Sequence, residues 1–325
     1  MPKSETSLEE LLHEIRRIEE HREQLSEDKI KAIYKTLMRD LKLFLGEAYE
    51  KYSDADGRLY LSYLDAQNKR AWFLNEIAKN CNGISPQLKK EMFDLVEETY
   101  SRTYSGMSEA VKTAVENGGL ALATQDIEVQ PDILNQAVNN NISKLTLPQV
   151  MEKHRAEIIY QIQQELFIGL TRGDRYDQMA KRISERVGVS RSKAMNISRT
   201  ESHRNTEAGF QDCAERIQEK LEDSDLVYIK IYRTVKDERV RPQQRRKTKK
   251  GWKTTYSNNG ANHVDMEGTV KMVTEPFVYS DGSKCMSPGS IELPARHSCN
   301  CRCFSEYRLV TKEEYEKIKK NGGKL

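Results

Sequence analysis

The stretch ISRTESHRN, residues 197–205, lies in the last long helical pattern before the periodicity of the chain changes, and it decides the fold. Steps of three and four residues from Ala194 through Ile197 reach Glu201 and Asn205, so a carboxylate and an amide fall on the otherwise apolar face of a helix. A buried carboxylate without a partner costs several kcal/mol. The stretch therefore predicts that Glu201 joins this helix to another part of the chain, unless the side chain is solvated at the helix edge.

The partner of Glu201 should be an arginine or a set of amide donors. Arg241 and Arg302, which follow in the C-terminal region, are the candidates. A catalytic role for Glu201 is not expected, because no nucleophile or second carboxylate lies at a suitable spacing. The predicted role is structural.

The chain before this stretch has helical periodicity. Ser7 and Glu10 have the spacing of a capping box, in which each side chain satisfies a free backbone amide of the first turn. Apolar residues at helical spacing follow, in one helix to Ile18 and in a second over residues 30–48. We expect a helical N-terminal domain over residues 1–120, which either buries its apolar stripes in a bundle or docks one face on a partner.

The middle of the chain predicts a linker and then more helices. Residues 121–146 contain a proline and an asparagine run, which favour a linker. Helical periodicity returns over residues 147–222, where Gly173 and Gly188 predict the ends of two helices. Ser190 is the predicted N-cap of a third, long helix that carries the stretch quoted above.

A small β-rich module is predicted over residues 223–310. Residues 227–233 alternate apolar with polar side chains, and a hairpin turn is expected at 236–238. Later strands include a last one over 299–307, and a short Lys-rich helix and tail follow over 311–325. The predicted fold class is α+β, with predominantly helical N-terminal and middle regions and a small, cysteine-containing, β-rich C-terminal module.

Composition excludes several classes of protein. A net charge of +3 over 325 residues is too small for a chain that coats nucleic acid indiscriminately. No stretch reaches the roughly 18 apolar residues of a membrane span, and the polar N-terminus is no secretory signal. The six cysteines do not have the even spacing of a secreted disulfide scaffold. We expect no membrane contact, and reduced thiols in a protein made in a cytosol.

The cysteine-rich segment near the C-terminus is a candidate metal site. In a strand, residues two apart point to the same side, so its three C-x-C cysteines would share one face. Together with nearby imidazoles they would suit a tetrahedral Zn²⁺, which would stabilise a small module. The spacing is shorter than that of paired zinc ligands, so buried free thiols and a disulfide are the alternatives. The potential ligands are His263, Cys285, His297, Cys299, Cys301 and Cys303.

A basic stretch interrupts the module over residues 242–261. Its density of cations would attract phosphates, with an affinity that falls steeply as salt rises. Neighbouring glycines and asparagines favour a flexible inserted loop, and contact with DNA is the alternative. The cations lie at Arg239, Arg241, Arg245, Arg246, Lys247, Lys249, Lys250 and Lys253, and the six from Arg245 onward are the candidates for DNA contact.

Residues 263–267 alternate in a way that could place His263, Asp265 and Glu267 on one side of a strand. Such a set is typical of a metal-dependent hydrolase. Without further acidic partners, a turn before Gly268 is the favoured interpretation.

Several segments of the C-terminal half occur in an order that is typical of one protein family. They are Gly169–Gly173 with Met179–Ile183, Ala194–Asn205, Asp237–Arg241, His263–Gly268 and Asn300–Cys303. Over about residues 150–308 the chain resembles the phage head morphogenesis family, the minor head or Mu F-like proteins of tailed bacteriophages. It departs from the family pattern in the basic stretch 242–261 and in the additional Cys299.

The resemblance implies a structural virion protein rather than an enzyme, present in few copies inside the capsid near the portal. It implies the portal protein, capsid or scaffold proteins and packaged DNA as partners, and roles in head morphogenesis and in DNA packaging or ejection. The helices of residues 1–120 are then the candidates for docking on the portal or capsid. The residues to which the resemblance gives a role in the structural core of the module are Arg199, Thr200, Glu201, Asn205, Arg241, His263, Gly268 and Arg302.

Two alternatives come from other functional classes. One is a metal-dependent hydrolase that acts on nucleic acid or cell wall and requires His263 or Glu201. The other is a stand-alone DNA-binding module, whose affinity should have a pronounced salt dependence and should be lost on deletion of residues 242–261.

Overall fold

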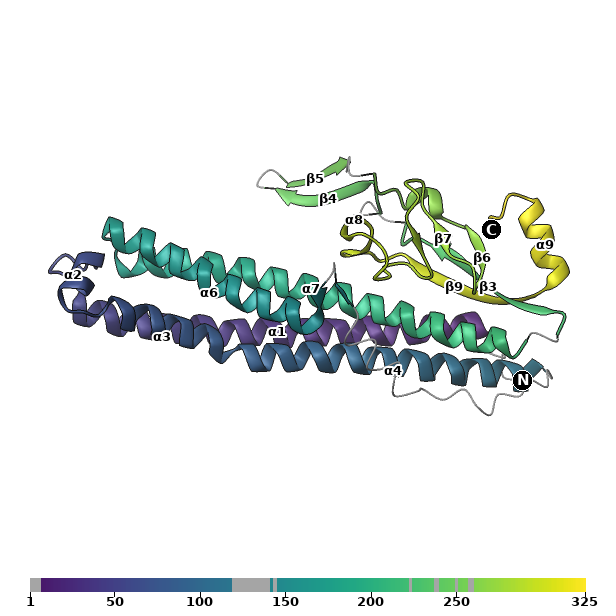
Figure 1. Cartoon of the computed structure of the whole chain (residues 1–325), viewed down its shortest axis with the longest axis horizontal. Helices are drawn as coiled ribbons and strands as arrows, with labels where there is room; N and C mark the ends of the chain where they lie inside the picture. The colour runs from purple at the N-terminus through teal and green to yellow at the C-terminus, as the bar shows by residue number, and fades with distance from the viewer. Residues whose placement is uncertain are drawn as a thin grey trace. The chain divides into compact units, whose positions relative to one another are not determined.

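The computed structural model is helical over most of its length and carries its main strands in the C-terminal part (Figure 1). The predicted α+β class is confirmed. The structure describes residues 7–118, 141–142, 145–221, 224–236, 240–248, 251–256 and 260–325.

Six helices of very different length precede the sheet module. None of the described helices has an apolar run long enough to span a membrane. The helices are α1 (Leu8–Tyr52), α2 (Leu61–Ala66), α3 (Arg70–Gly83), α4 (Ser85–Gly118), α6 (Leu147–Arg172) and α7 (Tyr176–Glu219).

Two predicted helix breaks are wrong. Helix α1 is continuous where we expected two helices, and α7 runs through Gly188 and Ser190, which were expected to end one helix and begin the next. An interior glycine costs a helix only about 1 kcal/mol. The burial of Ile183 and Ala194 on either side of Gly188 is the larger contribution.

Other predicted helix ends are confirmed. The Ser7 hydroxyl accepts from the Glu10 amide at 3.2 Å while the Glu10 carboxylate accepts from the Ser7 amide at 2.9 Å, so the capping box is formed. Helix α6 ends at Gly173, whose φ of 67° is left-handed. A Cβ at Gly173 would collide with the ring of Tyr60, so both the backbone conformation and the space require glycine.

The main sheet has β3 (Leu226–Arg233) at its centre, antiparallel to both β6 (Val270–Met272) and β9 (Phe304–Thr311). Among the described residues, three two-stranded sheets accompany it. The remaining elements are β1 (Asn141–Ile142), β2 (Leu145–Thr146), β4 (Gln243–Thr248), β5 (Gly251–Tyr256), η1 (Val264–Met266), β7 (Phe277–Val278), β8 (Lys284–Cys285), α8 (Ala295–Ser298) and α9 (Lys312–Lys320).

Three predictions about the strands need correction. The basic stretch contains the antiparallel pair β4 and β5 rather than a loop. Strand β4, which follows β3 along the chain, pairs with β5, so β3 and β4 do not form the predicted hairpin. Of the turn expected at 236–238, residues 237 and 238 lie outside the described residues. The last strand begins at Phe304, because α8 and a turn with Asn300 at a φ of 51° occupy the preceding residues.

The described residues fall into two compact units, each assembled from separate stretches of the chain. The first contains the start of α1, the part of α4 from Val96, and the chain from Arg199 onward. The second contains residues 24–95 and 145–198. Of the predicted linker over 121–146, only the short strands β1 and β2 are described.

In the first unit the sheet is covered on both faces. Tyr228 and Tyr307 of the sheet pack with Phe210 of α7 and with aromatic residues of α4. On the opposite face, Val227, Ile229 and Ile231 of β3 pack against Tyr315 of α9. Figure 1 shows α9 next to the sheet, at the right of the view. A doubly covered central strand explains why both alternating sets of β3 are buried.

The second unit is held mainly by apolar side chains at helical spacing. A buried polar contact between α1 and α6 interrupts this core, where the hydroxyl of Tyr34 lies 2.6 Å from Nε2 of His154. Burial lowers the pKa of His154 to about 4, and the charge of Lys193 adds to the decrease. The principal apolar core residues are Ile30, Leu37, Leu41, Phe73, Ile77, Ile158, Ile162, Leu166, Met179 and Ile183.

Candidate functional site

A stripe of five polar side chains on α7 attaches the sheet module to the helix. We call Thr200, Arg204, Glu207, Gln211 and Gln218 the anchoring stripe. Their spacing places them on one face of α7, and all five are buried. Each hydrogen-bonds a backbone group of the module: Thr200 with the Asn300 amide at 3.2 Å, Arg204 with the Gly289 carbonyl at 3.2 Å, Glu207 with the Ser305 amide at 2.9 Å, Gln211 with the Val273 carbonyl at 2.6 Å and Gln218 with the Tyr228 amide at 2.7 Å.

The partner of Glu201 is Arg204, one helical turn along α7. Glu201 is buried, and its Oε1 accepts from Nη1 of Arg204 at 2.6 Å. Burial raises the pKa of the Glu201 carboxyl, and Arg204 opposes that rise. The predicted partners were wrong, because Arg241 donates instead to the carbonyl oxygen of Cys299 and the side chain of Arg302 is exposed. A residue three positions away on the same helix is already within reach, so no strand residue is needed.

Two other predicted core residues lie around Glu201. Thr200 belongs to the anchoring stripe and meets the turn at Asn300. The Asn205 amide donates to the carbonyl of Glu201 at 2.8 Å, which is a contact within α7. Arg199 is half-buried next to them. The structure thus brings Thr200 to the module and leaves Asn205 within the helix.

Glu207 is a structural residue that sequence reasoning missed. Its side chain is fully buried, and it pairs with Arg16 of α1 while it accepts from the amide at the start of β9. Arg16 also donates to the Ser305 carbonyl at 2.7 Å and lies over the rings of Phe210 and Phe304, at 4.2 and 4.9 Å from their centroids. Three segments far apart in the sequence therefore meet at one buried ion pair.

Lys230 of β3 is a second missed residue. Its ammonium is buried and donates to the carbonyl oxygens of Met286 at 2.6 Å and Val273 at 3.0 Å, and to Oε1 of Gln211 at 3.2 Å. Burial lowers the pKa of Lys230 to about 8. Polar residues that alternate with apolar ones along a strand usually face solvent. Here α7 covers the face of β3 on which Lys230 lies.

A cluster of histidine and cysteine side chains lies inside the module. Nδ1 of His263 is 3.4 Å from Sγ of Cys303 and 3.7 Å from Sγ of Cys301, and the Tyr232 hydroxyl lies 3.3 Å from the same nitrogen. All four side chains are buried. Among the described residues, His263, Cys301 and Cys303 form a group whose donor atoms all lie within 4.8 Å of one another, so they could hold a metal ion.

A chain of hydrogen bonds connects His263 to Asp281. Nε2 of His297 lies 2.9 Å from a carboxylate oxygen of Asp281. Burial lowers the pKa of His297, and Asp281 opposes that decrease. Nδ1 of His297 lies 3.1 Å from Nε2 of His263. The other nitrogen of His263, Nδ1, therefore faces the two sulfur atoms.

The two sulfur atoms differ in acidity. The pKa of Cys301 is well below that of an ordinary thiol, first because the Cys303 thiol hydrogen-bonds its sulfur and further because His203 and His263 do so. The pKa of Cys303 is correspondingly raised, since its proton is held against Cys301 and the thiol is buried. His203 lies on α7, so the cluster also contacts the helix.

The other predicted ligands do not join this group. Cys285 is buried beside the Tyr279 hydroxyl at 4.0 Å, Cys299 is exposed, and both nitrogens of His297 are used in the chain described above. The predicted alternation of three cysteines on one strand face is wrong, because the residues before Phe304 are not a strand. All six cysteines are free thiols in the structure.

The segment from His263 to Gly268 forms a turn, as favoured. Val264–Met266 is a 3₁₀ turn in which His263 is buried while Asp265 is exposed, so the carboxylates do not gather around the histidine. Gly268 has a φ of 76°, and a Cβ there would collide with the carbonyl oxygen of Leu325. The arrangement required for the alternative of a metal-dependent hydrolase is not formed by these residues.

The basic stretch pairs Gln243 with Tyr256 through to Thr248 with Gly251. Arg239, Lys249 and Lys250 lie outside the described residues. Contact of Lys249 and Lys250 with DNA stays a prediction, as it does for the other four candidates in the hairpin.

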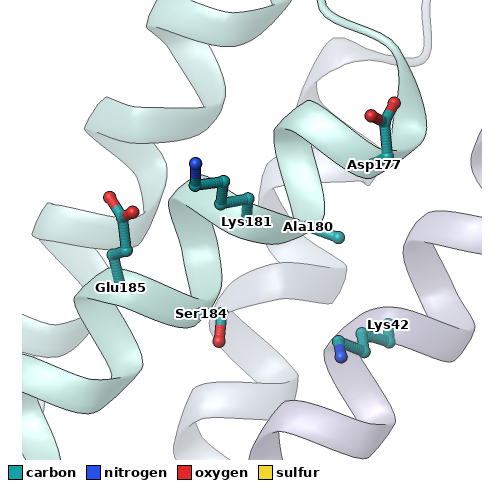
Figure 2. A pocket seen from close by; sticks show the side chains of 6 residues that line it. All are labelled: Lys42, Asp177, Ala180, Lys181, Ser184 and Glu185. Carbon is teal, nitrogen blue, oxygen red and sulfur yellow. The ribbon is translucent and has the colours of Figure 1, made fainter.

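An open pocket of about 400 Å³ lies in the second unit. Figure 2 shows its lining, in which charges of both signs come from α1 and α7. Most of these side chains are exposed, and the apolar contribution is a single alanine, so the pocket lacks the buried, convergent polar groups of a specific ligand site. The lining residues are Lys42, Asp177, Ala180, Lys181, Ser184 and Glu185.

Fold and site together define a class of protein in which a small sheet module is fastened to a long helix by buried polar contacts. Residues 160–306 match the family described as phage Mu protein F like protein. The chain is also 26% identical over 283 residues to "Minor head protein GP7" of Bacillus phage SPP1, with 87% of this chain and 82% of that protein covered. No solved structure matches the chain significantly. The two matches support the assignment of the chain as a Mu F-like minor head protein of a bacteriophage.

Proposed function

We propose that this minor head protein lies inside the head near the portal and supports head morphogenesis as a structural component rather than as an enzyme. The observation that carries the proposal is the extent of the likeness to the minor head protein of phage SPP1, which reaches well beyond residues 160–306 and so includes helices outside the family match. A role of the helical region in docking is consistent with that extent.

The use of the buried polar groups supports a structural role. Each member of the anchoring stripe bonds a backbone group of the module, and Glu201 and Glu207 are both paired with arginines. Catalytic acids and bases need open access to a substrate. The buried carboxylates of α7 are instead occupied by contacts that hold the protein together.

Two exposed aromatic side chains support docking on another head protein. Tyr160 and Phe167 of α6 are 63% and 53% exposed, although aromatic residues of this size are usually covered. They lie seven residues apart, which places them on one face of the helix. Aromatic residues are enriched where proteins bind one another. We propose that this face of α6 contacts the portal protein or a capsid or scaffold subunit.

The basic hairpin of β4 and β5 supports contact with packaged DNA. Six cations and no acidic residue occur between Gln243 and Tyr256. The protein as a whole carries only +3, so this concentration of charge is local. Such a segment binds phosphates without sequence preference. We propose that it contacts DNA during packaging or ejection.

Co-expression with the neighbouring phage structural genes tests the proposal. The tagged chain should recover portal, capsid or scaffold subunits, which mass spectrometry would identify. The double variant Tyr160→Ser/Phe167→Ser should lose most of this recovery. A matched control is Lys35→Ser/Gln87→Ser, which changes two exposed positions on other helices of the same unit and should retain the partner. A monomer that recovers no head protein would contradict the proposal.

DNA contact is tested separately with the variant Arg245→Gln/Arg246→Gln/Lys247→Gln. It should weaken binding of the purified protein to duplex DNA and reduce its salt dependence, while recovery of head proteins is unchanged. Equal DNA binding by the variant and the wild type would remove the hairpin from the proposal. It would leave the docking function standing.

A further inference from the structure

The His–Cys cluster of the module unites three donor atoms from two parts of the chain. His263 lies just before the 3₁₀ turn η1, whereas Cys301 and Cys303 lie between α8 and β9. The donor atoms are Nδ1 of the histidine and the two Sγ atoms, and they converge in the interior of the module. Imidazole with two sulfur atoms is a ligand set that zinc prefers.

The distances between these donor atoms suit one tetrahedral ion. Zn–S bonds of about 2.3 Å and Zn–N bonds of about 2.0 Å at tetrahedral angles separate a nitrogen and a sulfur ligand by about 3.5 Å. The observed separations from His263 Nδ1 are 3.4 Å to Cys303 and 3.7 Å to Cys301. An ion could therefore be seated with side-chain shifts of only a few tenths of an ångström.

The hydrogen-bond chain behind His263 prepares it as a ligand. Asp281 bonds Nε2 of His297, and Nδ1 of His297 bonds Nε2 of His263, so Nδ1 of His263 faces the sulfurs. The two histidine rings are parallel to within 2°, which keeps this chain in one orientation. A carboxylate that orients a metal-binding histidine is a recurring feature of zinc sites, and here a second histidine relays the effect.

The cluster directs three potential ligand atoms toward one point. Nδ1 of His263 lies within 3.7 Å of both sulfur atoms, and all three side chains are buried. A single cation would be bound by the histidine and both sulfurs at once. The converging geometry thus favours a metal over buried free thiols.

We propose that His263, Cys301 and Cys303 bind one Zn²⁺. The ion would fasten the turn at residue 263 to the segment that leads into β9. His297 and Asp281 act as positioning residues, and Cys285 and Cys299 take no part. The site is independent of the proposed docking function.

Elemental analysis of the full chain tests the site. The protein is purified from zinc-supplemented cells under reducing conditions, and zinc is measured per chain. One equivalent is expected. Cys301→Ser and Cys303→Ser should each lose at least half of it, whereas the controls Cys285→Ser and Cys299→Ser should keep it. A folded, reduced wild type without zinc would overturn the proposal, and so would a mass that shows an intramolecular disulfide in place of the metal.

A second measurement covers ligand variants that fail to fold. X-ray absorption of the zinc-loaded wild type should fit two sulfur and two nitrogen or oxygen neighbours, and a shell without sulfur would overturn the assignment. Asp281→Asn removes the charge behind His297 without removing a ligand, and it should weaken zinc binding about tenfold. An unchanged affinity would exclude Asp281 from the site.

Discussion

The two halves of helix α7 are buried in different ways. Residues 176–198, in one compact unit, bury chiefly apolar side chains such as Met179 and Ile183. Residues 199–219, in the other unit, bury Arg204, Glu207 and Gln211 among others. One continuous helix therefore uses shape-tolerant apolar packing along its first half and directed hydrogen bonds along its second.

This difference affects what each region specifies. Apolar packing tolerates exchange between side chains of similar volume, so many sequences can form the second unit. A hydrogen bond to a backbone amide or carbonyl requires a donor or acceptor at one position. The anchoring stripe contacts mainly the backbone of the module, so it fixes the register between helix and sheet largely independently of the side chains that the sheet carries. Polar anchoring thus provides specificity, and apolar packing provides most of the stability.

If the polar half of α7 holds the sheet module, Glu207→Ala should have the largest effect. It leaves Arg16 without its buried partner and the Ser305 amide without an acceptor. Loss of one member of a buried ion pair costs about 3–5 kcal/mol. Hydrogen exchange should show loss of protection in β3 and β9, with the helices of the second unit unchanged.

The control for this variant is Glu219→Ala on the same helix. Glu219 pairs with Arg216 in a surface ion pair, with side chains 61% and 43% exposed, and such pairs contribute about 0–1 kcal/mol. Equal effects of the two variants would mean that the buried contact does not hold the module.

The unit that contains the apolar half of α7 should instead respond to pH through His154, a buried histidine of α6. The folded pKa of His154 is about 4, below its ordinary value of 6.5, so the unfolded chain takes up this proton first as pH falls. Stability that is present above about pH 6.5 should therefore be lost progressively down to about pH 4, by about 3 kcal/mol. Urea unfolding followed at amides of α6 would measure it.

His154→Gln should flatten this pH dependence, because it removes the titrating ring next to Tyr34. His21→Gln is the control, since His21 is exposed on α1 and its replacement should leave the slope in place. An unchanged slope in His154→Gln would assign the pH response to other groups.

The contrast between the halves also decides what could be predicted from the sequence. Apolar periodicity correctly indicated the helices and the buried stripe of α6, and the resemblance correctly indicated the family. The partner of Glu201 was wrong because either a local or a distant arginine satisfies a carboxylate. Glu207 and Gln211 are spaced like the residues around Glu201, yet a polar residue on a helix is usually solvated, so only the position of the sheet reveals their burial.

The cysteine cluster is a second case in which the sequence alone did not predict which side chains meet. Residue types alone gave six potential ligands, of which the structure brings three together. The difference lies in one turn, because α8 and Asn300 rotate Cys299 outward and direct Cys301 and Cys303 inward. A local turn of this kind leaves little periodic signal in the sequence.

The smallest expected effects come from two glycines of α7, one in each half. A Cβ at Gly188 would meet no atom within 4 Å, whereas a Cβ at Gly209 would lie 3.0 Å from the carbonyl oxygen of Tyr100 on α4. Gly188→Ala should therefore stabilise the protein by up to about 1 kcal/mol through helix propensity alone. Gly209→Ala gains the same propensity but must push α4 away, at a net cost of about 1–2 kcal/mol. Thermal unfolding of both variants measures the pair. If the two changes in stability have opposite signs, the backbones of α4 and α7 must approach closely at Gly209, and Gly188 is a tolerated interruption of the helix. If both variants are stabilised, α4 and α7 are free to separate at Gly209.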